Sequence, residues 1–524
     1  MHRYIVRVAA VVLFLFSFLS SELIAQTSRI LELENEKAYQ LIERFVKRGR
    51  FNSINPTKLP YTHSDIYKEL QELDYDRLSN IEKEWYDQLK EEIRYSEKLE
   101  AKDYVIEPYV ISGSVFNNSE IKNSYRPTSD SKYVWPFTDL GLFADYKNFT
   151  INTNVRFDLY YEFGPFDLDP TNRLYMRNED SYVGYSSEYF QGYVGRFENN
   201  WGIYDRKSTF MSDNAPTFDQ INYTIGSRKF SFTTLHAFLD NISGNDEFEG
   251  NTVNDPLSKR RYLSLKRIDW RVSDHLALSM KEGILYSGMN VNPEPKYMIP
   301  GFLYFLLEAS NPRDQVENLF IGGNLWFNKS GFSVNLDMMI DDLIGNRKER
   351  GISEKNNFSL IVNSSYSFRN RPIAVNWDLE FITYQTYNTD QAEGRYLYLS
   401  KGIATEFNDY IFNELSLEYF ADLKVKGLTI EPYVGLLKQG EQIINQTFQS
   451  SYPNGDEFEI VLTGTVESTT RFAFKTYYSP VSYFWAKLDM GYNIVDNFRN
   501  IEGMKSNRFV GMFEVGFKFN FKNL

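Results

Sequence analysis

From Tyr104 to the C-terminus, apolar and polar residues alternate with a period of two, and this pattern constrains the fold more than any other feature. The same alternation is clear over residues 151–159, 332–338 and 484–494. In the last predicted strand, Phe513, Val515, Phe517, Phe519 and Phe521 alternate with Glu514, Gly516, Lys518, Asn520 and Lys522. Successive side chains of a strand point to opposite faces, so one face is apolar and aromatic while the other carries charge.

Two all-β folds have an apolar face of this kind. In a soluble sandwich it meets a second sheet, whereas in a membrane barrel it meets lipid and the charges face the lumen. Aromatic residues make up 17% of the chain, with 38 Tyr and 42 Phe, which favours the barrel because outer-membrane barrels carry aromatic girdles. The aromatic C-terminal strand also resembles the signal that the barrel assembly machinery reads, although Lys522, Asn523 and Leu524 follow Phe521.

The predicted connections alternate between short and long. Tight turns are predicted at Lys147-Asn148, Gly226-Ser227, 328–331 and Lys426-Gly427, and long polar loops at 162–181, 240–259, 343–356 and 441–458. Short turns at one end and long loops at the other are typical of outer-membrane barrels. At roughly 20–25 residues per strand and connection, the region from Tyr104 to Leu524 gives about 16–20 strands.

Residues 1–25 are predicted to be a secretory signal. Arg3 and Arg7 precede an apolar run from Val8 to Leu19, which is too short to span a bilayer. We expect cleavage after Ala25; the alternative is an uncleaved anchor. The chain has no cysteine, which excludes lipoprotein anchoring, disulfides and thiolate metal sites. The expected location is the outer membrane of a Gram-negative bacterium.

Residues 26–100 are predicted to form a small helical domain, and residues 101–524 the barrel. Leu31, Ala38, Leu41, Ile42, Phe45 and Val46 fall at helix spacing. Ser64 is the predicted cap of a second helix. Ser79 is the predicted cap of a third, with Glu82 three residues on as in a capping box. The domain is densely charged and has no lipid-facing stripe, so we expect it either to stand in water or to plug the periplasmic mouth.

Several functional classes are disfavoured. The chain has 57 basic and 70 acidic residues and no basic patch, which argues against a nucleic-acid partner. The three histidines after the signal, His63, His236 and His275, have no metal-ligand spacing, and there is no HExxH or GxSxG motif. We therefore expect no cofactor, no metal and no catalysis.

One region combines turn chemistry with groups that could bind a sugar. Residues 195–202 read GRFENNWG and residues 211–219 read MSDNAPTFD. Ser-Asp-Asn-Ala-Pro is by itself a turn sequence. Arg196, Trp201, Asp213 and Asn214 also supply a cation, a stacking face and hydrogen-bonding groups, which a saccharide needs. The alternative is that this loop folds into the lumen and only constricts it.

These two elements resemble the Wzi capsule assembly family, whose hallmark is a Gly-Arg…Trp-Gly element followed by Ser-Asp-Asn-Ala-Pro-x-Phe-Asp. The segment Tyr61-Thr62-His63-Ser64 is similar too. So are later stretches at 261–269, 282–286, 297–300 and Glu317-Asn318. The chain departs from the family near 402–410, where Thr405 to Asp409 replace an expected Gly-Pro-Asp turn.

The resemblance implies a barrel of about 18 antiparallel strands whose helical bundle plugs the periplasmic mouth. It also implies a lectin-like, non-catalytic protein that holds capsular or exopolysaccharide at the cell surface, as a monomer in outer-membrane lipid. The candidate glycan-binding residues are Arg196, Trp201, Asp213, Asn214, Asp219, Glu282 and Asn318. The rival functions are a porin-like diffusion channel and, behind it, an outer-membrane enzyme. The net charge of −13 disfavours a strongly anionic polymer unless local Arg and Lys offset it.

Overall fold

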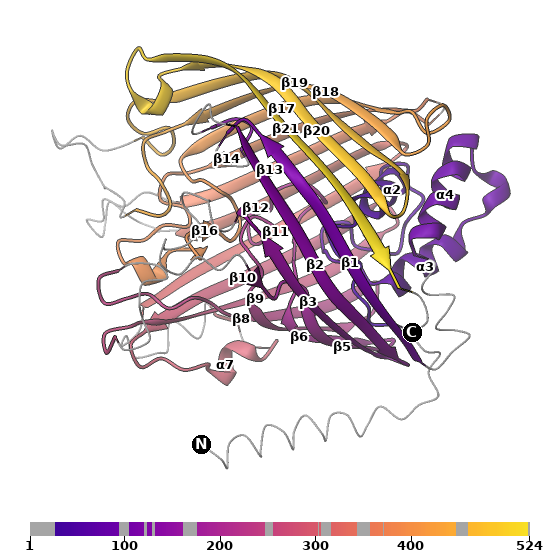
Figure 1. The fold of residues 1–524 in the computed structure, drawn as a ribbon. Coiled ribbons are helices and arrows are strands. Elements are labelled where there is room, and N and C mark those ends of the chain that lie inside the picture. The colour runs from indigo at the N-terminus through magenta and orange to yellow at the C-terminus, as the bar shows by residue number, and fades with distance from the viewer. Residues whose placement is uncertain are drawn as a thin grey trace.

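The strands close into one barrel. The computed structural model describes residues 27–93, 104–119, 123–127, 132–160, 176–246, 255–301, 303–304, 316–342, 357–369, 371–446 and 459–521. Nineteen strands form a single sheet, in which β4 and β5 share one position because both pair with β3. The first strand, β1, pairs with the last, β21. The result is a closed antiparallel barrel of 18 strands, which confirms the predicted fold class (Figure 1).

The strand bounds are β1 Tyr104–Asn117, β2 Tyr133–Tyr146, β3 Phe149–Asp158, β4 Met176–Arg177, β5 Ser181–Ser186, β6 Phe190–Arg196, β7 Asp219–Gly226, β8 Phe230–Phe238, β9 Arg260–Ser273, β10 Leu276–Gly288, β11 Val316–Lys329, β12 Phe332–Asp342, β13 Asn357–Ser367, β14 Ile373–Ile382, β17 Tyr410–Phe420, β18 Leu428–Gln439, β19 Glu467–Val481, β20 Phe484–Asp496 and β21 Lys505–Asn520. The hairpin β15 Leu397–Tyr398 and β16 Lys401–Gly402 lies outside the barrel sheet. The helices are α2 Glu36–Lys47, α3 His63–Glu72, α4 Asn80–Glu92 and α7 Pro295–Met298, with short 3-10 turns at Tyr75–Arg77, Ala392–Gly394 and Phe498–Asn500.

The connections alternate in length, as predicted. Ser330 and Gly331 join β11 to β12 in a tight turn, where both have positive φ angles of 58° and 88°. The connection at Lys426-Gly427 is longer than predicted, because β17 ends at Phe420. The predicted loop 162–181 is shortened by β4 and by Ser181, which begins β5. Its residues 162–175, the whole of 343–356, and residues 247–254 and 447–458 lie outside the described residues. We take the short-turn end as periplasmic.

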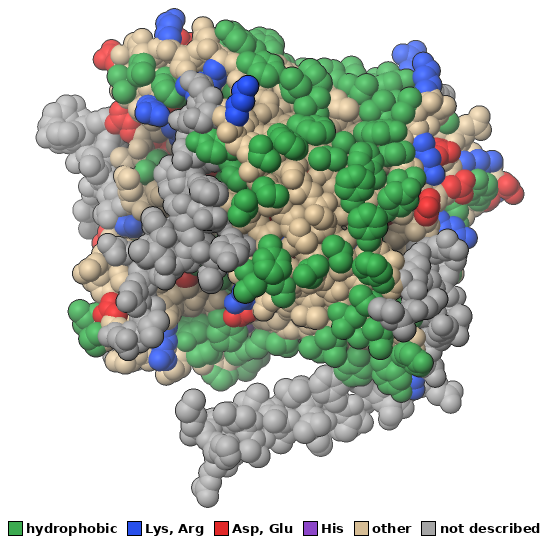
Figure 2. All heavy atoms as spheres, viewed as in Figure 1, with side chains coloured by type: hydrophobic (Ala, Val, Ile, Leu, Met, Phe, Trp, Pro, Cys, Tyr) green, Lys and Arg blue, Asp and Glu red, His purple; other side chains and the backbone are tan. Residues whose placement is uncertain are grey.

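The outer face of the barrel is apolar. In β12, Phe332, Leu336 and Met338 are exposed, whereas Ser333 and Asp337 between them are buried. Hydrophobic side chains spread across the strands in Figure 2, and charged side chains gather at the two ends. A belt of this kind is suited to lipid, so the predicted assignment of strand faces is confirmed.

Helices α2, α3 and α4 pack at the short-turn end (Figure 1), and we call residues 27–93 the plug. All six apolar residues predicted for the first helix are buried, although Leu31 precedes α2, which begins at Glu36. The plug core packs on Trp326 and Phe420 of the barrel wall. The capping box of Ser79 and Glu82 is confirmed. The predicted cap at Ser64 is wrong, because Thr62 caps α3 through reciprocal bonds with Asp65. None of the helices in the described residues is long and apolar enough to cross a membrane.

Candidate functional site

The loop that carries the Ser-Asp-Asn-Ala-Pro sequence is hydrogen-bonded to a second loop that comes much later in the sequence. The Ser212 amide donates to the Ile403 carbonyl at 3.0 Å, and its hydroxyl donates to the Ala404 carbonyl at 2.5 Å. The Asn214 side chain donates to the Gly402 carbonyl at 2.7 Å. These bonds hold residues 201–217 against residues 396–404 in the long-loop half of the barrel.

A buried ion pair fixes this loop to the barrel wall. The Lys281 ammonium of β10 lies 2.8 Å from a carboxylate oxygen of Asp337 on β12, and neither side chain is exposed. Lys281 also donates to the Trp201 carbonyl at 2.9 Å, while Asp337 accepts from the Ser208 hydroxyl and the Thr209 amide, both at 3.0 Å. Because a buried charge is costly unless it is paired and hydrogen-bonded, this arrangement stabilises the inserted position of the loop.

Aromatic packing completes the insertion. Phe210 lies against Gly322 of β11, where an added Cβ atom would come within 2.8 Å of the ring. The hydroxyl of Tyr396 donates to the Phe210 carbonyl, and that of Tyr387 donates to the Thr209 carbonyl, both at 2.7 Å. The two tyrosine rings stack with centroids 5.7 Å apart. The loop therefore occludes this part of the lumen.

The structure separates the predicted glycan-binding residues. Arg196 and Asp219 pair with each other at 2.6 Å near the long-loop ends of β6 and β7, with side chains 29% and 59% exposed. Trp201 is buried beside Phe210, so its ring faces are covered by protein. Asp213 is exposed, in the turn of the inserted loop.

The two residues from the later motifs lie elsewhere. Glu282 follows Lys281 in β10, so it points to the opposite face of the wall, where it is 5% exposed. Asn318 donates to the Gly394 carbonyl at 3.2 Å. The seven predicted residues therefore do not converge on one point.

The lumen has an acidic character around the inserted loop. Burial raises the pKa of Glu198, and the nearby carboxylates of Glu34, Asp180 and Asp213 raise it further. Burial also raises the pKa of Asp213, although Lys207 lowers it. Although the Asp213 side chain is exposed, the protein atoms around it raise its pKa by desolvation. Surplus negative charge here would repel an anionic polymer.

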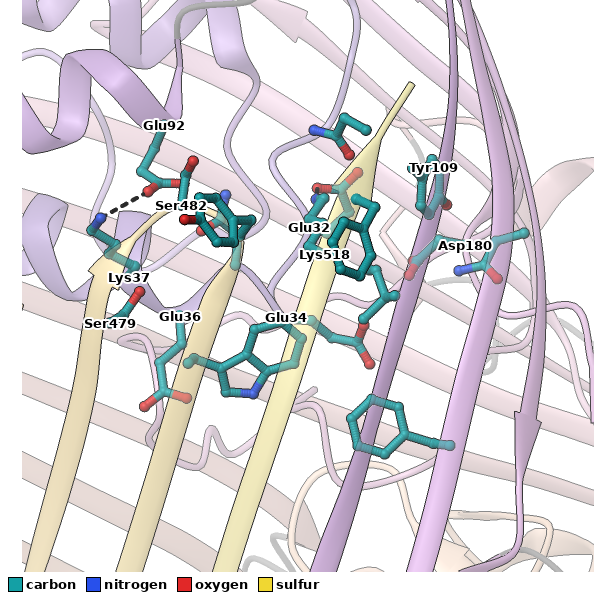
Figure 3. Close-up of a pocket in the computed structure, with 18 of the residues that line it drawn as sticks. Glu32, Glu34, Glu36, Lys37, Glu92, Tyr109, Asp180, Ser479, Ser482 and Lys518 are labelled. Atoms are coloured by element: carbon teal, nitrogen blue, oxygen red, sulfur yellow. Dashed lines mark ion pairs between the residues drawn. The ribbon is translucent and has the colours of Figure 1, made fainter. Parts of the chain in front are cut away.

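A cavity of about 620 Å³ lies between the plug and the wall formed by β1–β3 and β19–β21 (Figure 3). Its lining includes Glu32, Glu34 and Glu36 from the first plug residues, and Figure 3 shows Glu32 beside Lys518 of β21. The cavity extends to Ser482 in the short turn between β19 and β20. No local sequence pattern indicates this cavity, because its walls come from segments more than four hundred residues apart.

Ion pairs stabilise the cavity walls. The Lys37 ammonium lies 3.1 Å from Glu92, as the dashed line in Figure 3 marks. Lys487 lies 2.6 Å from Glu36 and 3.3 Å from Glu514. Within the part of the chain that the structure describes, no group of three or more His, Asp or Glu side chains could hold a metal ion.

Comparison with known proteins shows what this arrangement resembles. No protein-family model and no curated protein matches the chain. A solved structure from Escherichia coli does match. It is Wzi, an outer-membrane protein involved in group 1 capsule assembly and described as a carbohydrate-binding β-barrel. The two are 11% identical, the match covers 94% of this chain and 100% of that one, and the TM-score is 0.62.

Outer-membrane proteins of Pseudomonas aeruginosa overlap less well. OccK3 (OpdO) is 11% identical with a TM-score of 0.46, over 79% of this chain and 96% of that one. OccK10 (OpdN) is 12% identical with a TM-score of 0.44, over 81% and 100%. Overlap at that level does not establish a shared arrangement. The fold of this chain is thus the fold of the Wzi outer-membrane β-barrel, as the resemblance of its sequence motifs predicts.

Proposed function

We propose that this outer-membrane barrel binds a polysaccharide at the cell surface and holds it there without catalysing a reaction on it. The observation that carries the proposal is the inserted loop, anchored by the buried pair of Lys281 and Asp337. A general diffusion pore needs an open lumen, whereas a retention protein needs only a stable surface. The fold shared with a carbohydrate-binding barrel supports the same reading.

Among the predicted residues, Asp213 and Asp219 are exposed, and Arg196, which pairs with Asp219, is partly exposed. We assign the glycan contact to these three. Trp201 supports the loop by packing instead of stacking on a sugar. Asn214 already donates to Gly402, so it acts by holding the turn.

Surface retention in cells tests the proposal. Asp213→Ala should reduce the amount of polysaccharide held at the surface while the barrel keeps its heat-modifiable migration. The effect should be partial, because one sugar hydrogen bond contributes about 0.5–1.5 kcal/mol net. Asp496→Ala is a matched control, since Asp496 is an exposed acid at the long-loop end of β20 that pairs with Lys505 at 3.2 Å. Equal retention in wild type, Asp213→Ala and Arg196→Ala would contradict the assignment.

A diffusion channel is the second candidate function. The cavity beside the plug favours a channel, because the cavity could form part of a path for solutes through the barrel. Single-channel recording separates the two. We expect small, infrequent conductance from the wild-type protein in planar bilayers. A large, stable conductance would favour the channel.

A further inference from the structure

We propose that the cavity between the plug and strands β1–β3 and β19–β21 is a second binding site, open to the periplasm, for a short oligosaccharide that carries free amino groups. Its volume, about 620 Å³, is enough for a few sugar rings. The site is separate from the surface glycan contact proposed above and does not depend on it.

The first step of the argument is charge. Eight Asp and Glu residues line the cavity, against five Lys and Arg residues. Lys37 and Lys487 are held by plug and wall carboxylates, and Arg29 lies 3.0 Å from Glu107. Burial raises the pKa of Glu36 and of Glu92, although the neighbouring lysines lower both. The surplus negative charge favours a cationic ligand over a uronate-rich one.

The second step is an aromatic surface. The Trp485 ring packs on Gly516 of the neighbouring strand, where an added Cβ atom would lie 2.1 Å from the ring. Its indole N–H donates to Glu514 at 2.9 Å, which fixes the ring orientation. Trp485 is only half-buried and lines the cavity. A fixed, partly exposed aromatic ring is suited to the C–H face of a sugar.

The third step is an unsatisfied acceptor. The side-chain oxygen of Asn154 has no hydrogen-bond partner among the described residues, and Asn154 is 3% exposed. It lines the cavity on β3. A buried polar atom without a partner is costly, so a hydroxyl or ammonium group of a bound sugar would offset that cost.

The fourth step is access. Ser482 and Tyr483 line the cavity and form the short turn between β19 and β20, and both are exposed. A ligand would therefore enter from the short-turn side. The loop lengths assign this side to the periplasm.

Calorimetric titration of the detergent-solubilised full-length protein tests the site. The probes are fully de-N-acetylated chitotriose, its N-acetylated form and a galacturonate trimer. We expect saturable binding of the first, at least tenfold weaker binding of the second and none of the third. Absence of saturable binding by the de-N-acetylated trimer would overturn the proposal, and so would equal binding of the galacturonate trimer.

Matched variants locate the binding. Trp485→Ala should lower the affinity for the de-N-acetylated trimer at least tenfold, while Trp485→Phe should lower that affinity less than threefold. Asp180→Asn, in the cavity lining, should reduce the preference for the free amine several-fold. Trp377→Ala is the control, because Trp377 is 40% exposed on the apolar face of β14. Equal loss in the Trp485→Ala and Trp377→Ala variants would overturn the location.

Two further measurements cover other outcomes. Spermidine tests charge alone: if it binds as tightly as the trimer and Trp485→Ala leaves the trimer's affinity unchanged, the sugar assignment is wrong.

The chain has no cysteine, so Ser482→Cys gives a single thiol at the mouth of the cavity. The trimer should slow its maleimide modification several-fold. An unchanged rate in the presence of saturating trimer would overturn entry from this side, even if Trp485→Ala failed to fold.

Discussion

The Asp422 carboxylate, in the turn between β17 and β18, lies 3.1 Å from the Arg44 guanidinium on helix α2. The same carboxylate accepts from the indole N–H of Trp85 and the side-chain amide of Gln88 on α4, each at 3.1 Å. One buried acid on the barrel wall thus anchors two plug helices. The plug is fixed by polar contacts at its edge as well as by its apolar core.

Asp422→Ala should therefore loosen the plug. Removing one member of a buried ion pair leaves an uncompensated charge and costs about 3–5 kcal/mol. We expect faster trypsin cleavage within residues 27–93, with no change in barrel migration on gels. Lys426→Ala is the control, because Lys426 makes an exposed, weak pair with Glu91 at 3.9 Å. Similar cleavage rates in the two variants would show that Asp422 is not the anchor.

Lys281→Met should release the inserted loop. Asp337 would then remain as a buried, unpaired carboxylate, at a cost of about 3–5 kcal/mol. We expect more frequent channel openings in planar bilayers. The double variant Lys281→Met/Asp337→Leu should open less often than the single one, because it contains no uncompensated charge. Identical recordings from wild type and Lys281→Met would rule out this tether.

Acidification should loosen the plug through His63. Burial lowers the pKa of His63 well below 6.5, and the nearby charges of Arg29 and Lys518 lower it further. His63 thus binds a proton more readily in the unfolded plug than in the folded one. Its contribution to the stability of the plug is therefore complete above about pH 6.5 and is lost as the pH falls below that value. Trypsin cleavage within the plug at pH 7.5 and 5, measured by mass spectrometry and normalised to the cleavage rate of an unfolded peptide at the same pH, should rise on acidification. His63→Gln should remove most of the change; an equal rise in this variant would assign the effect to other groups.

Phe517→Arg should block assembly of the barrel. Phe517 is 42% exposed on the outer face of β21, and a cation at mid-bilayer costs about 2–4 kcal/mol in a membrane barrel. Lys518→Gln should be mild, since Lys518 faces inward and lies 3.9 Å from Glu32. The measurement is the yield of heat-modifiable protein in the membrane fraction. Comparable yields from the two variants would refute the assignment of faces.

The sequence alone determined the barrel, because strand alternation is a local property. Each strand shows its lipid face through its own residues, as Phe332 and Leu336 do in β12, and closure follows from the number of such strands. The plug helices were visible for the same reason, since helical spacing and the Ser79 capping box are local. The exact cap of α3 was not, because Thr62 lies only two residues before the predicted Ser64 and backbone geometry selects between them.

The site depended on contacts that no local pattern encodes. Lys281 and Asp337 occupy ordinary inward positions of two strands, and only the inserted loop makes them partners. Trp201 is of a residue type that can stack on a sugar, but tertiary packing buries it. The cavity lined by Trp485 and Asn154 lies where β3 and β20 are brought near each other by the pairing of β1 with β21. The sequence determines which face of its strand a side chain lies on. Strand register, barrel closure and loop insertion determine which side chains come into contact.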